Sequence, residues 1–302
     1  MNKRKWWNQL DNNWKKVFKK AIDTEDEPTE SDLDNIFNLP KLNCHFNFNK
    51  TSNLEPLRAL TNLQILDCSY NEASDLEPLR ALTRLQTLVF NYNKIHDLGP
   101  LRALTGLQTL IFNGNKINTL EPLHALTNLQ YLESQLNNIS NLEPLRCLTN
   151  LRTLICYSNE ISDLGPLRAL TNLQELYCGK NQISDLEALC SLTNLRVLNC
   201  GSNKISNLEP LYALTNLRIL DCYDNKIGDL EPLHTLIRLH ELRCGDNNIS
   251  NLEPLRSLKN LRDLECKNNQ INDLEPLRTL TNLRRLECEG NQISNDKFVG
   301  IG

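Results

Sequence analysis

The stretch LDCYDNKIGD, residues 220–229, contains residue types that carry out chemistry in many proteins. Cys222 is a candidate nucleophile, and Asp221, Asp224 and Asp229 are candidate general bases or calcium ligands. A catalytic cysteine needs one activated thiolate beside a base. An EF-hand loop needs oxygen ligands at positions 1, 3, 5 and 12 with glycine at position 6, whereas the glycine here is at position 8 counted from Asp221. The spacing therefore does not support a calcium loop.

Cys222 belongs to a 22-residue unit that occurs eleven times between residues 54 and 295. The first copy reads LEPLRALTNLQILDCSYNEASD. Positions 1, 4, 7, 10 and 13 are Leu in every copy, position 18 is always Asn, and position 20 is Ile in every copy but the first. Position 15 is Cys in eight copies. A twelfth, degenerate unit precedes them and contains, if one residue is deleted, Leu33, Ile36, Leu39, Leu42, Cys44, Phe46 and Asn49.

A unit this short cannot bury enough side chains alone, so the repeats must stack into a solenoid. Positions 10–15 are expected to form one parallel strand per repeat. Because side chains alternate across a strand, the cysteine at position 15 should enter the core with the leucine at position 13, forming a cysteine ladder of buried thiols. The asparagine at position 18 should turn inward and satisfy loop backbone groups, forming an asparagine ladder. Cys190 is expected to be the most accessible thiol, and Cys147 is expected to pack.

The core pattern L-x-x-L-x-C-x-x-N-x-I resembles the leucine-rich repeat. Its 22-residue form, with the segments TNLxxL and NxIxDLxPL, resembles the repeats of bacterial internalins and of the phosphatase-regulatory class, over residues 33–295. The resemblance implies an α/β fold, a right-handed leucine-rich repeat solenoid with a parallel β-sheet on the concave face and short 3₁₀ or helical turns on the convex face. It also implies a role in binding proteins.

The two ends of the chain depart from the repeat. Residues 1–31 place Trp6, Trp7, Trp14 and Phe18 at helical spacing and are expected to form an amphipathic helical cap for the solenoid, residues 32–295. The alternative is a membrane-surface helix, since lysines and arginines supply a basic face. Seven acids between residues 23 and 34 could neutralise that face. The tail, residues 296–302, contains Phe298, Val299 and Ile301, which are expected to cover the last repeat imperfectly.

The variable strand positions, 12, 14, 16 and 17, are expected to face a partner. Six of the seven tyrosines lie at these positions, with exposed aliphatic residues such as Leu136 beside them, and the last four repeats carry eight acids there. This surface predicts a protein partner with an apolar anchor and a basic flank. The expected partner-binding residues are Tyr70, Tyr92, Ile111, Tyr131, Glu133, Ile155, Tyr157, Tyr177, Asp221, Tyr223, Asp224, Glu241, Asp246, Asp263, Glu265 and Glu287.

The predicted function is therefore a non-catalytic protein-interaction scaffold, and the chain is expected to be a monomer. The net charge of −4 gives no reason to expect nucleic acid. No phosphate loop, GxSxG or HExxH motif occurs, so no catalytic residue, cofactor or metal is expected. No apolar run suits a signal peptide or a membrane span, and many reduced thiols favour the cytoplasm. The alternative is a surface or secreted internalin-like adhesin or effector. A leucine-rich effector ligase is disfavoured, since few residues lie outside the array.

Overall fold

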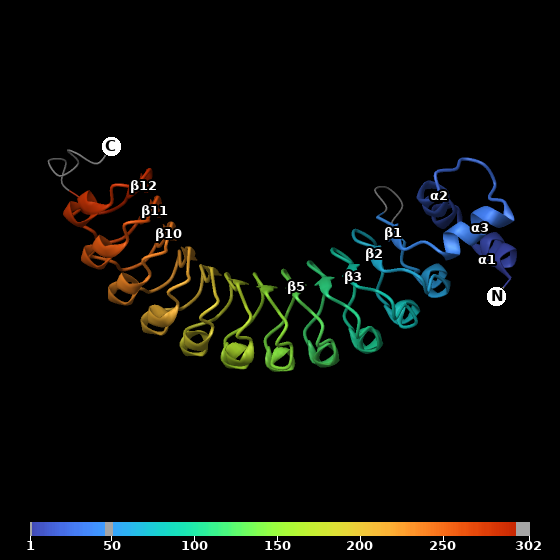
Figure 1. Cartoon of the computed structure of the whole chain (residues 1–302), viewed down its shortest axis with the longest axis horizontal. Helices are drawn as coiled ribbons and strands as arrows, with labels where there is room; N and C mark the ends of the chain where they lie inside the picture. Colours follow the sequence, from blue (N-terminus) through green and yellow to red (C-terminus); the bar gives the residue numbers. More distant parts are fainter. Residues whose placement is uncertain (1, 46–50, 294–302) are drawn as a thin grey trace. The chain divides into compact units, whose positions relative to one another are not determined.

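The computed structural model describes residues 2–45 and 51–293. The chain divides into two compact units, Met1–Ile139 and Ser140–Gly302. Each unit contains parallel strands on one side and short 3₁₀ helices on the other (Figure 1). In the second unit the strands crowd together while the 3₁₀ helices fan out, so the strand side of that unit is concave. Phe46 and Asn49 of the degenerate repeat, and the tail residues Phe298, Val299 and Ile301, lie outside the described residues.

The strands follow one another in sequence order within each unit. In the first unit they are β1 (Lys41–Asn43), β2 (Ile65–Asp67), β3 (Thr87–Val89), β4 (Thr109–Ile111) and β5 (Tyr131–Glu133). In the second they are β6 (Thr153–Ile155), β7 (Glu175–Tyr177), β8 (Val197–Asn199), β9 (Ile219–Asp221), β10 (Glu241–Arg243), β11 (Asp263–Glu265) and β12 (Arg285–Glu287). The register sets each position-13 leucine opposite the next, as in Leu88 and Leu110.

One 3₁₀ helix begins at position 2 of each repeat. In the first unit these are η1 (Glu55–Ala59), η2 (Glu77–Leu79), η3 (Gly99–Ala103) and η4 (Glu121–Ala125). In the second they are η5 (Glu143–Leu145), η6 (Gly165–Ala169), η7 (Glu187–Ser191), η8 (Glu209–Ala213), η9 (Glu231–Thr235), η10 (Glu253–Ser257) and η11 (Glu275–Thr279). Proline near the start of most of them fixes φ without removing a needed backbone donor.

The core consists of the leucines at positions 1, 4, 7, 10 and 13, nearly all of them fully buried. The asparagine ladder forms as expected. Asn115 Nδ2 donates to the carbonyl oxygens of Phe90, Phe112 and Asn113 at 3.0, 3.1 and 3.3 Å. Asn115 Oδ1 accepts the backbone N–H of Ile95 at 3.1 Å. One amide thus satisfies backbone groups of two successive repeats, which would otherwise be buried without partners.

The cysteines at position 15 are buried between the leucine rows, as the strand alternation predicted. Burial raises the pKa of the Cys156 and Cys266 thiols to about 12, so both remain protonated at neutral pH. The expectation for the two outlying cysteines was wrong: Cys147 is exposed and Cys190 is half-buried. Positions 4 and 7 of the 3₁₀ turn point inward, so position 6, where Cys147 lies, points to solvent.

The N-terminus forms three helices rather than one: α1 (Lys3–Gln9), α2 (Asn12–Ala21) and α3 (Glu30–Phe37). The break occurs because Asp11 accepts the backbone N–H groups of Asn13 and Trp14 and so starts a new helix. The predicted aromatic face is real, since Trp7, Trp14 and Phe18 are fully buried. Trp14 Nε1 donates to the Asn53 carbonyl oxygen at 3.0 Å, which joins α2 to the residue that directly precedes the first full repeat.

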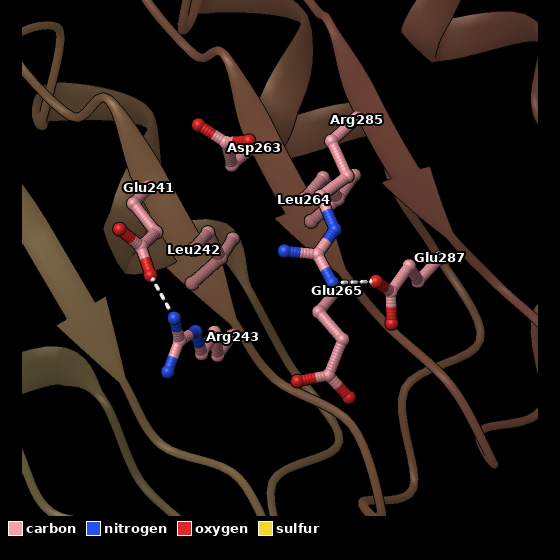
Figure 2. Close-up of a pocket in the computed structure, with 8 residues that line it drawn as sticks. All are labelled: Glu241, Leu242, Arg243, Asp263, Leu264, Glu265, Arg285 and Glu287. Carbon is pink, nitrogen blue, oxygen red and sulfur yellow. Dashed lines mark ion pairs between the residues drawn. The ribbon is translucent and has the colours of Figure 1, made fainter.

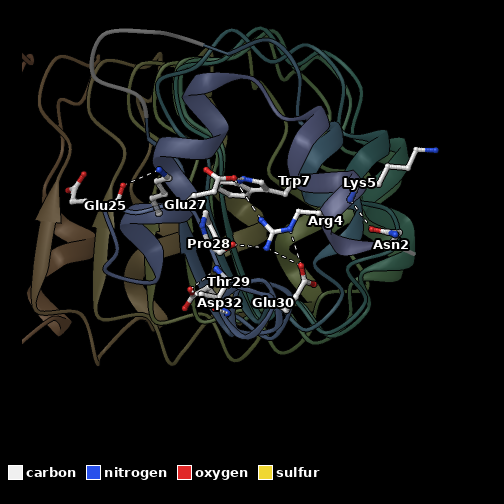
Figure 3. A network of polar contacts seen from close by, with 11 residues as sticks. Asn2, Arg4, Lys5, Trp7, Glu25, Glu27, Pro28, Thr29, Glu30 and Asp32 are labelled. Atoms are coloured by element: carbon white, nitrogen blue, oxygen red, sulfur yellow. Dashed lines mark hydrogen bonds and ion pairs between the residues drawn. The ribbon is translucent and has the colours of Figure 1, made fainter.

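Two of the N-terminal basic residues, Lys3 and Arg4, pair with acids that follow them in the chain. Arg4 pairs with Glu30 at 2.9 Å and donates to the Pro28 carbonyl oxygen at 2.7 Å (Figure 3). Trp7 Nε1 donates to Glu27 Oε1 at 2.5 Å. The aromatic face that a membrane-surface helix would need is packed inside the protein. None of the helices in residues 2–45 and 51–293 is long and apolar enough to cross a bilayer.

Candidate functional site

The outward side of the strands carries every residue predicted to bind a partner. Each of those residues is exposed or half-buried, while positions 13 and 15 are buried, apart from the half-buried Leu286 of the last repeat. The predicted residues fall into two separate groups. The first unit holds Tyr70, Tyr92, Ile111, Tyr131 and Glu133. The second unit holds Ile155, Tyr157, Tyr177, Asp221, Tyr223, Asp224, Glu241, Asp246, Asp263, Glu265 and Glu287.

Position 17 of every repeat has a left-handed backbone, which sequence analysis missed. The value of φ lies between 50° and 73° in all eleven copies. The turn is needed because the position-17 N–H donates to the next repeat, as from Tyr92 to the Asn113 carbonyl oxygen at 2.7 Å. Glycine, asparagine and aspartate adopt this conformation most easily, and Gly114, Asp246 and Asn268 occupy it. Their presence in one column was the available sequence signal.

Three bulky apolar residues occupy this unfavourable position in the first unit. Tyr70, Tyr92 and Leu136, together called the apolar rim, are 46%, 45% and 46% exposed. The Tyr70 and Tyr92 rings stack with centroids 4.9 Å apart, and His45 stacks on Tyr70 at 4.8 Å. A Cβ added to Gly114 would lie 2.5 Å from Tyr92 Cδ1. The glycine therefore gives the Tyr92 ring room to lie over the next repeat.

Glu133 on β5 is held by its own chain. Its carboxylate accepts hydrogen bonds from Asn113 Nδ2 at 2.7 Å, Gln135 Nε2 at 2.6 Å and the Tyr131 hydroxyl at 2.9 Å. These bonds fix Tyr131 on the surface and use most of the capacity of the carboxylate. Glu133 therefore holds neighbouring side chains in place, whereas the sequence predicted only that it would bind a partner.

Tyrosines in the second unit lie against glycines of the following repeat. A Cβ on Gly179 would lie 3.0 Å from Tyr157 Cδ2, and one on Gly245 would lie 3.3 Å from Tyr223 Cδ2. Both rings remain more than a third exposed. A hydrogen bond with Asp246 raises the pKa of the Tyr223 phenol. The glycines thus let each aromatic ring lie low on the strand face without losing its accessible surface.

The far end of the second unit forms a charged pocket of about 430 Å³ on β10, β11 and β12 (Figure 2). Arg243 pairs with Glu241 at 2.7 Å, and Arg285 pairs with Glu287. Asp263 and Glu265 lie on β11 between these two pairs, and neither forms an ion pair with another described residue. The pocket therefore contains more carboxylates than guanidinium groups.

The pKa values of these acids move in two directions. Burial raises the pKa of Glu265 on β11 and of Asp221 on β9. Hydrogen bonds from Lys267 and Arg285 lower the pKa of Glu287. Glu287 is thus already neutralised, whereas ionised Glu265 and Asp221 would gain from a cation brought by another molecule.

The stretch around Cys222 does not form a catalytic centre. Burial, followed by the neighbouring thiols Cys244 and Cys200, raises the pKa of Cys222 well above its usual value. Its carboxylate neighbour Asp221 points outward, where Oδ2 accepts from Asn199 Nδ2 at 2.9 Å. Within the ranges that the structure describes, no group of three or more His, Cys, Asp or Glu side chains is arranged to hold a metal ion.

A family model described as "Leucine Rich repeats (2 copies)" matches the chain repeatedly. The matched residues are 83–123, 149–191, 171–213, 193–234, 215–257, 237–279 and 259–298. No curated protein matches the chain by sequence.

Solved structures of bacterial proteins are also similar. An internalin, InlF, from Listeria monocytogenes is 31% identical, with 95% of this chain and 84% of that chain covered and a TM-score of 0.88. The functional domain of InlJ from Listeria monocytogenes, which includes a cysteine ladder, is 26% identical. The match covers 97% of this chain and 62% of that chain, with a TM-score of 0.83. This chain thus spans less than two thirds of that chain. A leucine-rich repeat protein of Leptospira interrogans, 21% identical, with 94% of both chains covered and a TM-score of 0.78, shows the fold alone.

Proposed function

The chain belongs to the leucine-rich repeat family, in its bacterial form, and from this premise we propose that it is a non-catalytic scaffold that binds a protein through the outward side of its strands. The apolar rim of Tyr70, Tyr92 and Leu136 is the observation that carries the proposal. A left-handed conformation costs a residue with a side chain roughly 1–2 kcal/mol. These side chains keep nearly half of their surface exposed, so what they bury within the chain, roughly half of the ~1.5–3 kcal/mol of a fully buried apolar side chain, does no more than about cancel that cost.

Position 17 of other repeats carries smaller residues. Gly114, Asp246 and Asn268 have the same backbone conformation without a bulky apolar group. A contact with another molecule explains why the rim retains tyrosine and leucine instead. Aromatic side chains in such surfaces contribute much of the binding energy to protein partners. The rim therefore supplies the apolar anchor site of the proposed interface.

A triple variant tests the rim: Tyr70→Asn, Tyr92→Asn and Leu136→Asn. Asparagine already occupies position 17 at Asn268, so the backbone should be retained. The matched control changes Ser158, Lys180 and Ser202, at the same position of the second unit, to Asn. Partners are captured from native lysate and identified by mass spectrometry, and their affinity for each variant is then measured. The proposal predicts loss with the rim variant only; retention of every partner by that variant would reject it.

The acids of the second unit suggest the basic flank of the partner. Glu265 and Asp221 are ionisable groups whose burial disfavours their charged forms, so a lysine or arginine brought by a partner would stabilise them. Glu265→Gln should therefore weaken binding of the captured partner and reduce the dependence of its affinity on salt. The control is Glu160→Gln, an exposed acid at position 19, off the strand. Equal salt dependence in both variants would remove the basic flank from the proposal.

We further propose that the chain works in the cytoplasm as a monomer. All eleven cysteines are free, and nine of them are buried, which suits a reducing compartment. The identity of 31% with a Listeria internalin favours the second candidate, a surface or secreted adhesin or effector. Cell fractionation with the native protein separates the two, and light scattering measures its mass. Recovery from the cell surface or the medium would favour the second candidate.

A further inference from the structure

The 3₁₀ side of the second unit contains a break in a charge pattern. Position 2 is usually glutamate and position 5 usually arginine, three residues apart on one turn. Glu143 of η5 pairs at 2.7 Å with Arg146, which directly follows η5, and Glu253 pairs at 2.7 Å with Arg256 on η10. Three consecutive repeats between them lack the arginine. Cys190, Tyr212 and His234 take its place on η7, η8 and η9, which pack against one another in sequence order.

The same three repeats expose apolar surface. Tyr212 is 54% exposed, and Ile237, which replaces the threonine that is usual at position 8, is 55% exposed. Pro210 and Pro232 are partly exposed, although the equivalent prolines of η5, η6, η10 and η11 are buried. The Tyr212 ring contacts the His234 ring edge to face at 5.7 Å. We call this surface the turn-face patch, formed by Cys190, Pro210, Tyr212, Pro232, His234 and Ile237.

Carboxylates without arginines border the turn-face patch. Glu187 and Glu209 are exposed, and neither forms an ion pair with any residue in the described ranges. Glu231 lies 3.5 Å from His234 Nδ1, which carries charge only when it is protonated. Three glutamates thus lie beside the patch without an arginine three residues later. In repeats that carry both residues, the arginine neutralises the charge of the glutamate. Its border is complementary to positive charge.

Hydroxyl groups hold the turns beneath the patch in place. Ser191 Oγ donates to the Arg168 carbonyl oxygen at 2.9 Å, and Thr235 Oγ1 donates to the Tyr212 carbonyl oxygen at 2.9 Å. Ser257 Oγ donates to the His234 carbonyl oxygen at 2.8 Å. The four full repeats of the first unit have alanine at this position and lack these bonds. The patch is therefore fixed before any partner arrives, which lowers the entropy lost on binding.

We propose that the turn-face patch is a second docking surface, for a protein segment that presents an apolar side chain flanked by lysine or arginine. The apolar side chain packs on Tyr212 and Ile237. The basic residues pair with Glu187 and Glu209, and an arginine can also stack on the exposed Tyr212 ring. An anionic lipid surface is disfavoured, because the same carboxylates repel it. This surface shares no residue with the apolar rim, so the experiments that test it do not depend on whether the strand-face proposal is correct.

The other repeats of the chain supply the test variant. Cys190→Arg, Tyr212→Arg, His234→Arg and Ile237→Thr, combined, install the residues that these positions carry elsewhere. The combined variant should keep the fold, which circular dichroism and urea unfolding verify. The matched control is His124→Arg on η4 of the first unit, which makes the same kind of change away from the patch. The rim triple variant is the second control.

The probes are immobilised twelve-residue peptides that combine three lysines or arginines with one leucine, phenylalanine or tryptophan, and a matched set with glutamate for each base. The best basic peptide should bind the wild type and both controls equally and the combined variant at least about ten-fold more weakly. Equal binding to wild type and combined variant would overturn the proposal, as would equal binding of the glutamate peptides. Phosphatidylserine vesicles are the third probe: patch-dependent binding to them, without peptide binding, would assign the surface to membranes and also overturn it.

Discussion

The asparagine ladder gives the sharpest test of how the repeats hold together, and Asn247 is the best place to apply it. Its Nδ2 donates to the carbonyl oxygens of Cys222, Cys244 and Gly245 at 3.0, 3.2 and 3.0 Å. Its Oδ1 accepts the Ile227 N–H at 2.9 Å. Asn247→Ala removes all four bonds and leaves the Ile227 N–H buried without an acceptor.

The cost can be worked out from these bonds. The two hydrogens of Nδ2 are shared among three acceptors, so the side chain makes the equivalent of about three full hydrogen bonds, which at about 1 kcal/mol net each amount to about 3 kcal/mol. A buried donor left without a partner costs roughly 1–3 kcal/mol, which is part of that sum rather than an addition to it. The expected loss in unfolding free energy is therefore about 2–4 kcal/mol. Asn248, the next residue, is exposed, so Asn248→Ala is the matched control and should cost less than about 0.5 kcal/mol.

Two assays separate a local loss from a global one. Urea unfolding measures the free energy of unfolding of both variants, summed over the steps in which the repeat array unfolds. Amide hydrogen exchange measures the Ile227 N–H directly, and its protection should fall in Asn247→Ala while the amide of Ile183 stays protected. Equal urea midpoints for the two variants, or unchanged protection at Ile227, would refute the account of the ladder.

Three further predictions concern thiols, pH and strain. At neutral pH a thiol reagent should label Cys147 first and Cys190 second, as read by mass spectrometry, because the other nine are buried; equally fast labelling of Cys222 would contradict the core assignment. Burial raises the Asp221 pKa, so the ionised carboxylate lowers stability at neutral pH, and this loss fades as the pH falls below the raised folded-state pKa. Asp221→Asn should raise the urea midpoint at pH 7 and leave it unchanged near pH 3; a constant difference would oppose this reasoning. Leu136→Asn should change the unfolding free energy by less than about 1 kcal/mol, because relief of the left-handed strain offsets lost contacts. The buried control Ile139→Ala should lower the unfolding free energy by about 2–5 kcal/mol. If urea unfolding gave similar losses for both variants, Leu136 would be a structural residue.

The repeated positions made most of the fold predictable. Leu88 and Leu110 lie at the same position in successive copies, so a single strand assignment in one repeat applied to all of them. The inward direction of Cys222 followed from its distance of two residues from Leu220. A three-residue strand is difficult to predict from one copy, but the same pattern in eleven copies made the strand assignment clear.

Features that depend on the phase of a turn were harder to predict. Cys147 belongs to a column of small residues, which read as packed, yet the 3₁₀ turn directs that column outward. Helical spacing continued across Asp11, although its capping bonds divide the N-terminal segment. The non-repeating segment offered only one copy from which to judge.

The candidate site was predictable as a surface but not as a set of contacts. The strand alternation placed Tyr70 and Tyr92 outward correctly, but not their left-handed backbone. The bonds of Glu133 reach Asn113, twenty residues earlier, so they depend on how neighbouring repeats align their side chains. Which surface residues bind a partner remains a prediction.

The asparagine ladder has a direction. Within each unit the amide of one repeat accepts the N–H and donates to a carbonyl of the repeat before it, as Asn269 does for Ile249 and Cys244. A repeat is therefore completed only when its successor docks. Synthesis proceeds from the N-terminus. The most recently synthesised repeat therefore lacks the hydrogen bonds from the asparagine of the next repeat, while earlier repeats already have theirs. The repeats can therefore complete their asparagine hydrogen bonds in the same order in which the ribosome synthesises them.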